Sequence, residues 1–255
     1  MSWIVCLLLV GAQSLATPAN APVAVQASDA EVADMRDSAL FRAAHKLADI
    51  HVGGTKMSSE VQATVRTQLK DQFSKMEDFQ YLEGEYPGVT QVVVDAAVPI
   101  AIRQTEDTIP EFIDRLAAFF AKKMTLDEIN DLTDWLTKPT IKRVRSSMDS
   151  NFDLGEIIEG SVADEDYQIS ADELERMTIK SAEQTVSKLS GEDIGMLVSF
   201  SKQESFKKYQ SLKPQAMSIE AEWSNESTPA GEQELETAVT QAIENFTGLD
   251  LSGVE

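Results

Sequence analysis

Apolar residues recur every three or four positions along most of the chain from Ser28 to Phe246. This spacing places them on one side of an α-helix and leaves the other side polar. Turn-forming residues, such as those around Pro87, separate the periodic segments. The pattern predicts an all-α fold, a multi-helix bundle of roughly eight helices around one main core.

Two neighbouring segments, Val89–Ile102 and the one that begins at Thr108, are predicted to form separate helices. The run Val89–Ile102 is rich in valine, which favours a strand, but Pro99 and the lack of a second strand to pair with favour a short buried helix. The next segment combines a capping box at Thr108 with Pro110 in the first turn. The sequence therefore predicts that a new helix begins at Thr108.

The stretch from Met124 to Met148 predicts a capped helix, a break and a second amphipathic helix. Pro139 ends the first helix or begins the second, and Thr137 is the expected cap beside it. The residues that form this structural motif are Thr125 and Glu128 as a capping box, the buried stripe Ile129, Leu132 and Trp135, and then Thr137 and Pro139.

A weaker copy of this stretch lies at Leu189–Lys213, at an offset of 65 residues and without a gap. Both copies have a hydroxyl cap, acidic residues in the first turn, an apolar stripe that ends in Trp135 or Phe200, and a basic second helix. Two unrelated capped helices would share part of this pattern. We interpret it as a degenerate internal repeat of a helical hairpin.

Residues Thr125–Lys142 resemble a secreted bacterial family, domain of unknown function number 2059, with a degenerate second copy at Ser190–Lys207. The family hallmark has a hydroxyl cap, a Glu three residues later, an aromatic pair, and a Pro followed by a Gly. Here Pro139 is present, but Ile141 stands where the family has that Gly. The resemblance implies an export signal and a helical fold, and it implies no known activity.

The amino-terminal segment predicts export. Trp3–Ala12 is an apolar run too short to span a bilayer, which takes about 20 residues, and small residues follow it. The lack of Lys and Arg before the run leaves a buried N-terminal helix as the alternative. We expect a periplasmic or secreted bacterial protein, with no transmembrane anchor once a signal peptide at 1–21 is cleaved after Ala16 or Ala21.

The rest of the chain divides by composition. The predicted segments are a flexible leader at 22–27, a helical domain at 28–150, an acidic connector at 151–169, a second helical copy with the C-terminal helix at 170–247, packed on the first copy, and a tail at 248–255. The connector is expected to be solvated, because acidic residues dominate it.

Charge narrows the choice of partners. The chain has 43 acidic and 22 basic residues, a formal net charge of −21, which repels nucleic acid and anionic membranes and favours cations or basic proteins. Many soluble proteins are acidic only for solubility, and this is the preferred interpretation of the charge. The single cysteine, Cys6, lies in the apolar run, so the mature chain is expected to form neither disulfides nor thiolate metal sites.

Two clusters are candidate sites. Asp164, Asp166 and Glu173 form a weak cation candidate that resembles part of a calcium loop. Tyr167 stands where such a loop needs Gly, so an acidic linker followed by a capping box is the preferred interpretation. The other cluster is a basic face that could bind an anionic ligand or an acidic partner, or pair with the connector. It comprises Lys138, Lys142, Arg143 and Arg145.

The sequence shows no catalytic constellation. His45 and His51 do not share a helix face, and there is no nucleophile motif, phosphate loop or nucleotide fingerprint. We therefore expect no catalytic residue, resident metal or cofactor. The leading hypothesis is an exported, non-catalytic protein that mediates protein interactions or structure in the cell envelope, with the partner and oligomeric state left open. The alternatives are a periplasmic binding protein for a cation or small anionic ligand, and a hydrolase of envelope polymers.

Overall fold

The computed structural model describes residues 37–250, apart from 154, 156, 158–159, 161–166 and 227–228. These residues contain ten helices and no strand, which confirms the predicted all-α class with more helices than expected. The helices are α3 (Ala39–Val52), α4 (Ser59–Phe73), α5 (Glu77–Glu85), α6 (Val89–Lys123), α7 (Leu126–Leu136), α8 (Pro139–Ser150), α10 (Ala171–Val186), α11 (Gly191–Ser201), α12 (Glu204–Ser224) and α13 (Pro229–Thr247).

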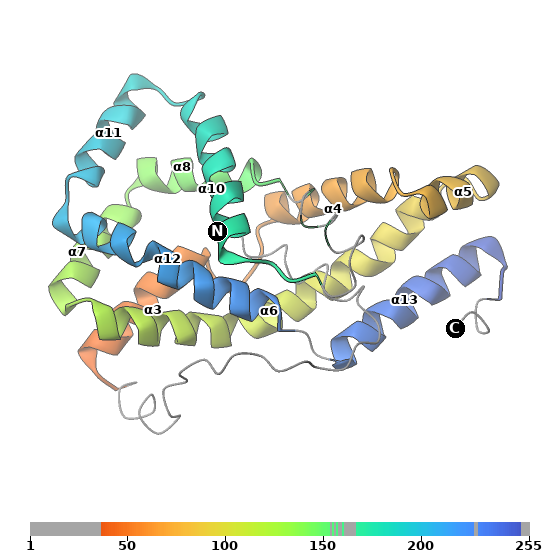
Figure 1. Ribbon diagram of the computed structural model, residues 1–255, viewed down its shortest axis with the longest axis horizontal. Coiled ribbons are helices and arrows are strands. Elements are labelled where there is room, and N and C mark those ends of the chain that lie inside the picture. Colours follow the sequence, from red (N-terminus) through yellow and green to blue (C-terminus); the bar gives the residue numbers. More distant parts are fainter. Residues whose placement is uncertain are drawn as a thin grey trace.

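The long helix α6 runs through the molecule, and α3, α4, α5, α12 and α13 pack along it (Figure 1). The run Val89–Ile102, for which a helix was favoured over a strand, is its first half. The prediction of a new helix at Thr108 is wrong, because α6 continues through Pro99 and Pro110. The Thr108 hydroxyl donates to carbonyls one turn earlier in the same helix instead of capping an N-terminus.

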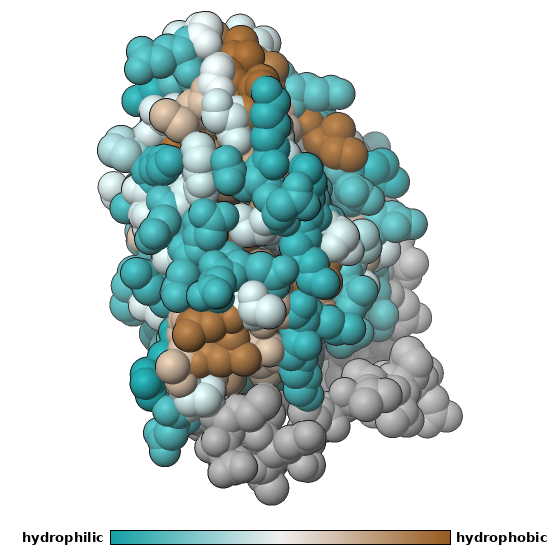
Figure 2. Space-filling view, turned by 90° about the vertical axis from the view of Figure 1, so that its left-hand side faces the viewer, coloured by the Kyte–Doolittle hydropathy of each residue, from teal (hydrophilic) through white to brown (hydrophobic). Residues whose placement is uncertain are grey.

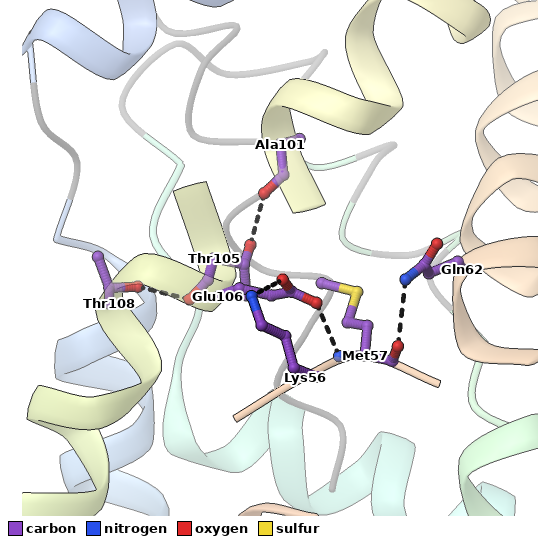
Figure 3. A network of polar contacts seen from close by, with 7 residues as sticks. All are labelled: Lys56, Met57, Gln62, Ala101, Thr105, Glu106 and Thr108. Atoms are coloured by element: carbon purple, nitrogen blue, oxygen red, sulfur yellow. Dashed lines mark hydrogen bonds and ion pairs between the residues drawn. The ribbon is translucent and has the colours of Figure 1, made fainter. Parts of the chain in front are cut away.

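Glu106 of α6 holds the loop between α3 and α4 (Figure 3). Its carboxylate accepts from Lys56 Nζ at 2.6 Å and from the Met57 backbone N–H at 2.9 Å. Burial alone would raise the pKa of Glu106, but these two donors outweigh it and hold the pKa below its ordinary value. The loop is therefore tied to α6 by a charged group, next to a Thr105 hydroxyl that bonds back into the helix at Ala101.

Buried hydrophobic residues form two clusters that share α6 and α12. The first lies among α3, the second half of α6 and α7, and the second lies among α4, the first half of α6 and α10. Helix α12 contributes Leu212 and Trp223 to the first cluster, and Met217 and Ala221 to the second. Phe112 of α6 stacks on Trp223 with 4.5 Å between ring centroids. These two helices therefore connect the clusters.

The predicted motif begins as expected at α7. Thr125 and Glu128 form a capping box, with the Glu128 carboxylate 2.8 Å from the Thr125 N–H, and the stripe residues Ile129 and Leu132 are fully buried. The predicted role of Thr137 as cap of the second helix is wrong. Thr137 is instead the C-cap of α7, where its backbone N–H donates to the Thr133 carbonyl at 3.0 Å, and the next residue, Lys138, is the N-cap of α8.

Helices α7–α8 and α11–α12 are matching hairpins. Both begin with a capping box, and both have a two-residue turn between their helices. Three of the four bounds of the second hairpin lie 65 positions after those of the first: Gly191 after Leu126, Ser201 after Leu136, and Glu204 after Pro139. The fourth does not, because α12 has 21 residues and α8 has only 12. The resemblance between the copies thus extends from sequence to the first cap, the length of the first helix and the turn that follows it.

The two hairpins contact each other reciprocally at one end of the molecule (Figure 1). Helix α7 packs on α12, and α8 packs on α11. Trp135 and Phe200, which are equivalent in the two copies, stack with 5.5 Å between ring centroids and 18° between ring planes. An interface in which a patch meets its own equivalent is the arrangement of a twofold-symmetric dimer. The hairpins are therefore packed like a dimer within one chain.

The predicted segments outside the helices have different outcomes. The signal peptide at 1–21 and the leader at 22–27 lie outside the described residues. In the connector, which was expected to be solvated, Phe152, Ile157 and Ile169 are instead buried in the second cluster, and the Asn225 side chain pairs with the backbone of Ile169.

None of the helices in the described ranges is long and apolar enough to cross a lipid bilayer.

Candidate ligand cavity

A cavity of about 420 Å³ lies between the two hairpins, and α3, α6 and α10 contribute to its walls. Its lining positions on α8 and α12 are spaced by one, three or four residues, so one face of each helix lines it. These residues are Ile141, Val144, Arg145, Met148 and Asp149 of α8, and Phe206, Tyr209, Gln210, Lys213, Ala216, Met217 and Glu220 of α12.

Equivalent positions of the two hairpins line this cavity together. In most of these pairs, an apolar residue of the first hairpin corresponds to a more polar residue of the second. The second hairpin is therefore more polar at these positions, although Arg145 and Asp149 of the first hairpin also line the cavity. The cavity lies where the two copies are related by their pseudo-twofold arrangement. The pairs are Leu136 with Ser201, Ile141 with Phe206, Val144 with Tyr209, Arg145 with Gln210, and Met148 with Lys213.

His51, in the last turn of α3, pairs through Nδ1 with the Tyr209 hydroxyl. Burial, together with the positive charges of Arg145 and Lys213, holds the pKa of His51 well below its ordinary value. Burial also raises the pKa of Tyr209 to about 12. A neutral imidazole and a neutral phenol therefore share this hydrogen bond at pH 7.

Arg145 joins the first hairpin to α3. Its guanidinium donates to the carbonyls of Ile50 and His51, the latter at 3.2 Å, in the last turn of that helix. A cation here stabilises the partial negative charge that the last carbonyls give to the C-terminal end of α3. Burial lowers the pKa of Arg145 from its ordinary value, but a guanidinium remains charged at neutral pH. The charge of Arg145 is thus engaged by the protein itself.

Two carboxyl groups line the cavity. Burial raises the pKa of Asp149 to about 6, against the opposing charge of Arg145, and raises the pKa of Glu220 to about 8, against that of Lys213. Glu220 is only 4% exposed, and its Oε1 atom has no hydrogen-bond partner among the described residues. A buried polar atom left without a partner costs about 1–3 kcal/mol. Glu220 therefore brings a buried carboxyl group to the cavity wall.

The four residues of the predicted basic face do not form one surface. The Lys138 ammonium lies over the Trp135 ring, 3.1 Å from its centroid. Arg143 pairs with Asp193 at the start of the second hairpin, and Lys142 is exposed. The side chain of Arg145 instead lines the cavity, so its assignment to the exposed face is wrong.

The position of Arg145 in its helix explains this difference. It directly follows the buried Val144 and lies one turn after the buried Ile141, so its long side chain can reach inward to the end of α3. The alternative that the basic residues pair with the acidic connector does not describe Arg143, because its partner lies in α11.

The weak cation candidate is described only in part, since Asp164 and Asp166 lie outside the described residues. Glu173 accepts from the Ser170 N–H and from the Tyr167 hydroxyl, both at 2.9 Å, and completes a capping box at the start of α10. The preferred interpretation of Glu173 as part of a cap is therefore confirmed. Within the described ranges, no group of three or more His, Cys, Asp or Glu residues could hold a metal ion.

Sequence reasoning missed the cavity residues His51, Tyr209, Lys213 and Glu220. Glu220 did offer a signal, because it lies on the apolar stripe of α12, four residues after the buried Ala216. Acidic side chains are rarely buried without a partner, so an acid on such a stripe indicates a special role. The other three residues have no comparable signal, since their place in the cavity follows from packing between distant segments.

Comparison with protein-family models, with curated proteins and with solved structures gives no match. The resemblance to the family of domain 2059 stays a prediction from the sequence.

Proposed function

We propose that the protein is an exported, non-catalytic binding protein that holds a small amphipathic molecule in the cavity between its two hairpins. The observation that carries the proposal is the cavity itself, with a volume of about 420 Å³ and a lining of apolar residues and polar groups from both hairpins. Pockets of this size, mostly apolar with a few placed polar groups, are typical of small-molecule sites.

The polar groups around the cavity support this proposal because most of them are held in place. Arg145 is bonded to the end of α3, and His51 and Tyr209 are bonded to each other. A ligand that meets positioned groups loses little free energy in ordering them. The carboxyl group of Glu220 is an exception, since it lines the cavity without a hydrogen bond among the described residues, and a ligand with a donor would suit it.

Thermal unfolding in the presence of hexanol, a neutral amphipathic probe, tests the proposal. A ligand that binds only the native state stabilises it by about 2.7 kcal/mol at 100 times its dissociation constant. The unfolding midpoint should therefore rise with hexanol concentration. We expect Met148→Trp to abolish this rise, because Met148 lines the cavity and the larger indole ring would occupy its volume.

Circular dichroism of the variant is the control, and it should show the helical content of the parent protein. A rise that persists in Met148→Trp would place hexanol binding outside the cavity and contradict the proposal. The absence of any rise with hexanol, hexylamine or hexanoate would also contradict it.

A protein partner in the cell envelope, the leading expectation from the sequence, stays a prediction. One observation favours it, namely that α10 and α11 expose large hydrophobic side chains. At the end of the molecule that includes α7 and α11, Figure 2 shows hydrophobic side chains in separate patches on a mostly hydrophilic surface. Cross-linking in the cell envelope would test for such a partner. The exposed residues are Ile179, Val186, Ile194 and Val198, each 44–53% exposed.

A further inference from the structure

We propose that the ligand is an organic amine, whose ammonium group binds to the Glu220 carboxylate while its apolar body lies against the wall formed by the first hairpin. This inference rests on the proposed binding function, and it specifies the chemical class of the ligand. Three features of the cavity support it: the carboxyl group of Glu220, the state of the neighbouring charges, and the aromatic lining.

The first feature is the carboxyl group of Glu220. Glu220 lines the cavity, is 4% exposed, and its carboxyl group has no hydrogen bond among the described residues. An ammonium group supplies three N–H donors and a positive charge, and charge-assisted hydrogen bonds are about twice as strong as neutral ones. An amine therefore satisfies the group in the cavity wall that the protein leaves unpaired.

The neighbouring cations do not create an equal demand for an anion. Arg145 already donates to backbone carbonyls of α3. Lys213 is partly exposed, so water can solvate its ammonium group when the cavity holds no ligand. Glu220 is much more deeply buried, at 4% exposed, and its carboxyl group has no hydrogen bond among the described residues. The stronger unmet requirement in the cavity is thus for a donor next to Glu220.

The aromatic lining and the charge of the whole chain also favour a cation. Phe120, Phe200, Phe206 and Tyr209 all line the cavity, and the faces of aromatic rings attract cations. The formal net charge of −21 attracts positively charged molecules to the protein and repels negatively charged ones.

Calorimetric titration of the full chain with hexylamine, hexanol and hexanoate tests the inference, because these probes share one apolar body and differ in their head group. We expect hexylamine to bind at least tenfold more tightly than hexanol, and hexanoate to bind least tightly. Glu220→Gln should reduce the affinity for hexylamine to that for hexanol. Glu222→Gln, an exposed charge change on the same helix, should leave all three affinities unchanged.

The pH dependence of hexylamine binding provides a second readout. The free site holds a proton, because burial raises the pKa of Glu220 to about 8, whereas binding of an ammonium group requires the carboxylate. The affinity for hexylamine should therefore rise about tenfold from pH 6 to pH 7 and level off above pH 8. The affinity for hexanol should not change in this way.

Other charged and titratable groups face the same cavity. They are His51 of α3, Arg145 and Asp149 of α8, and Tyr209 and Lys213 of α12. Of these, Asp149 has a pKa of about 6 and so titrates at the lower edge of the tested range. The Asp149→Asn variant should retain the tenfold rise for hexylamine, and Glu220→Gln should lose it.

The outcomes separate this inference from the proposed function. If hexanol binds in the cavity and hexylamine binds no more tightly, the amine inference is wrong and the binding function stands. If hexanoate binds most tightly and Glu220→Gln has no effect, the ligand is an anion, and the inference is again overturned. If none of the three probes binds, both proposals fail.

Discussion

Trp135 is the residue at which the two hairpins meet. Its ring stacks on Phe200, the equivalent residue of the other copy, and is covered on one side by the Lys138 ammonium. Trp135→Ala would remove the stack and leave a gap between the hairpins. We expect a loss of about 2–4 kcal/mol in the free energy of unfolding, because the ring is partly exposed and not fully buried. Urea denaturation followed by circular dichroism measures this loss.

Lys142→Glu is the matched control for Trp135→Ala. Lys142 lies one turn after Lys138 but is exposed, and no ion pair of its side chain is seen among the described residues. Its substitution should change the free energy of unfolding by less than about 0.5 kcal/mol. If Trp135→Ala left the free energy of unfolding unchanged and Lys142→Glu lowered it strongly, the side of the motif that carries Lys142 would be the buried one.

Glu220 makes the stability of the ligand-free protein depend on pH. The unfolded chain loses this proton above about pH 4.5, whereas the folded protein keeps it until about pH 8, because burial raises the pKa of Glu220. The unfolded state thus binds fewer protons between these values, so the contribution of Glu220 to stability falls as the pH rises through this window.

Glu220→Gln removes the titrating group and keeps the shape of the side chain. Relative to the parent protein, the variant should gain stability steadily from pH 5 to pH 8, by at most about 4–5 kcal/mol. Urea denaturation at several pH values measures the difference, with the exposed Glu222→Gln as control. A difference between variant and parent that does not change with pH would contradict the assignment of the raised pKa to Glu220.

At the scale of the elements, local pattern was a good guide to where helices form and a poor guide to where one helix becomes two. The capping box and Pro110 at Thr108 indicate an N-terminus, since proline is tolerated in a first turn. The structure has one helix there, because α6 packs along its length against α3, α13 and α4. Tertiary packing outweighed the local signal, and the Thr108 hydroxyl bonds to its own helix instead.

The hairpins could be predicted further than the cavity between them. The repeat predicted two hairpins from caps and stripes, and the structure shows them with first helices of equal length at the 65-residue offset. The cavity depends on how α8 packs across from α12, which neither helix encodes by itself. Arg145 illustrates this limit, because its spacing from Lys138 and Lys142 predicted an exposed face, while its partners are carbonyls of α3.

At the scale of the whole molecule, the two hydrophobic clusters should unfold together. Helices α6 and α12 each contribute buried residues to both clusters, so neither cluster can lose its packing without removing support from the other. Leu174→Ala tests this coupling, because Leu174 is fully buried in the second cluster and its truncation should cost about 3 kcal/mol. Trp135 and Trp223 report on the first cluster through their fluorescence, in a Trp3→Phe background.

If the clusters form one cooperative unit, Leu174→Ala should lower the urea midpoint of tryptophan fluorescence as much as that of circular dichroism, in a single transition. Leu132→Ala, which truncates a fully buried residue of the first cluster, is the matched control and should shift both signals equally. Two separate transitions, or a fluorescence midpoint that Leu174→Ala leaves unchanged, would show that the clusters unfold independently. In that case the shared helices α6 and α12 would not transmit stability from one cluster to the other, and the cavity between the hairpins would open without loss of the second cluster.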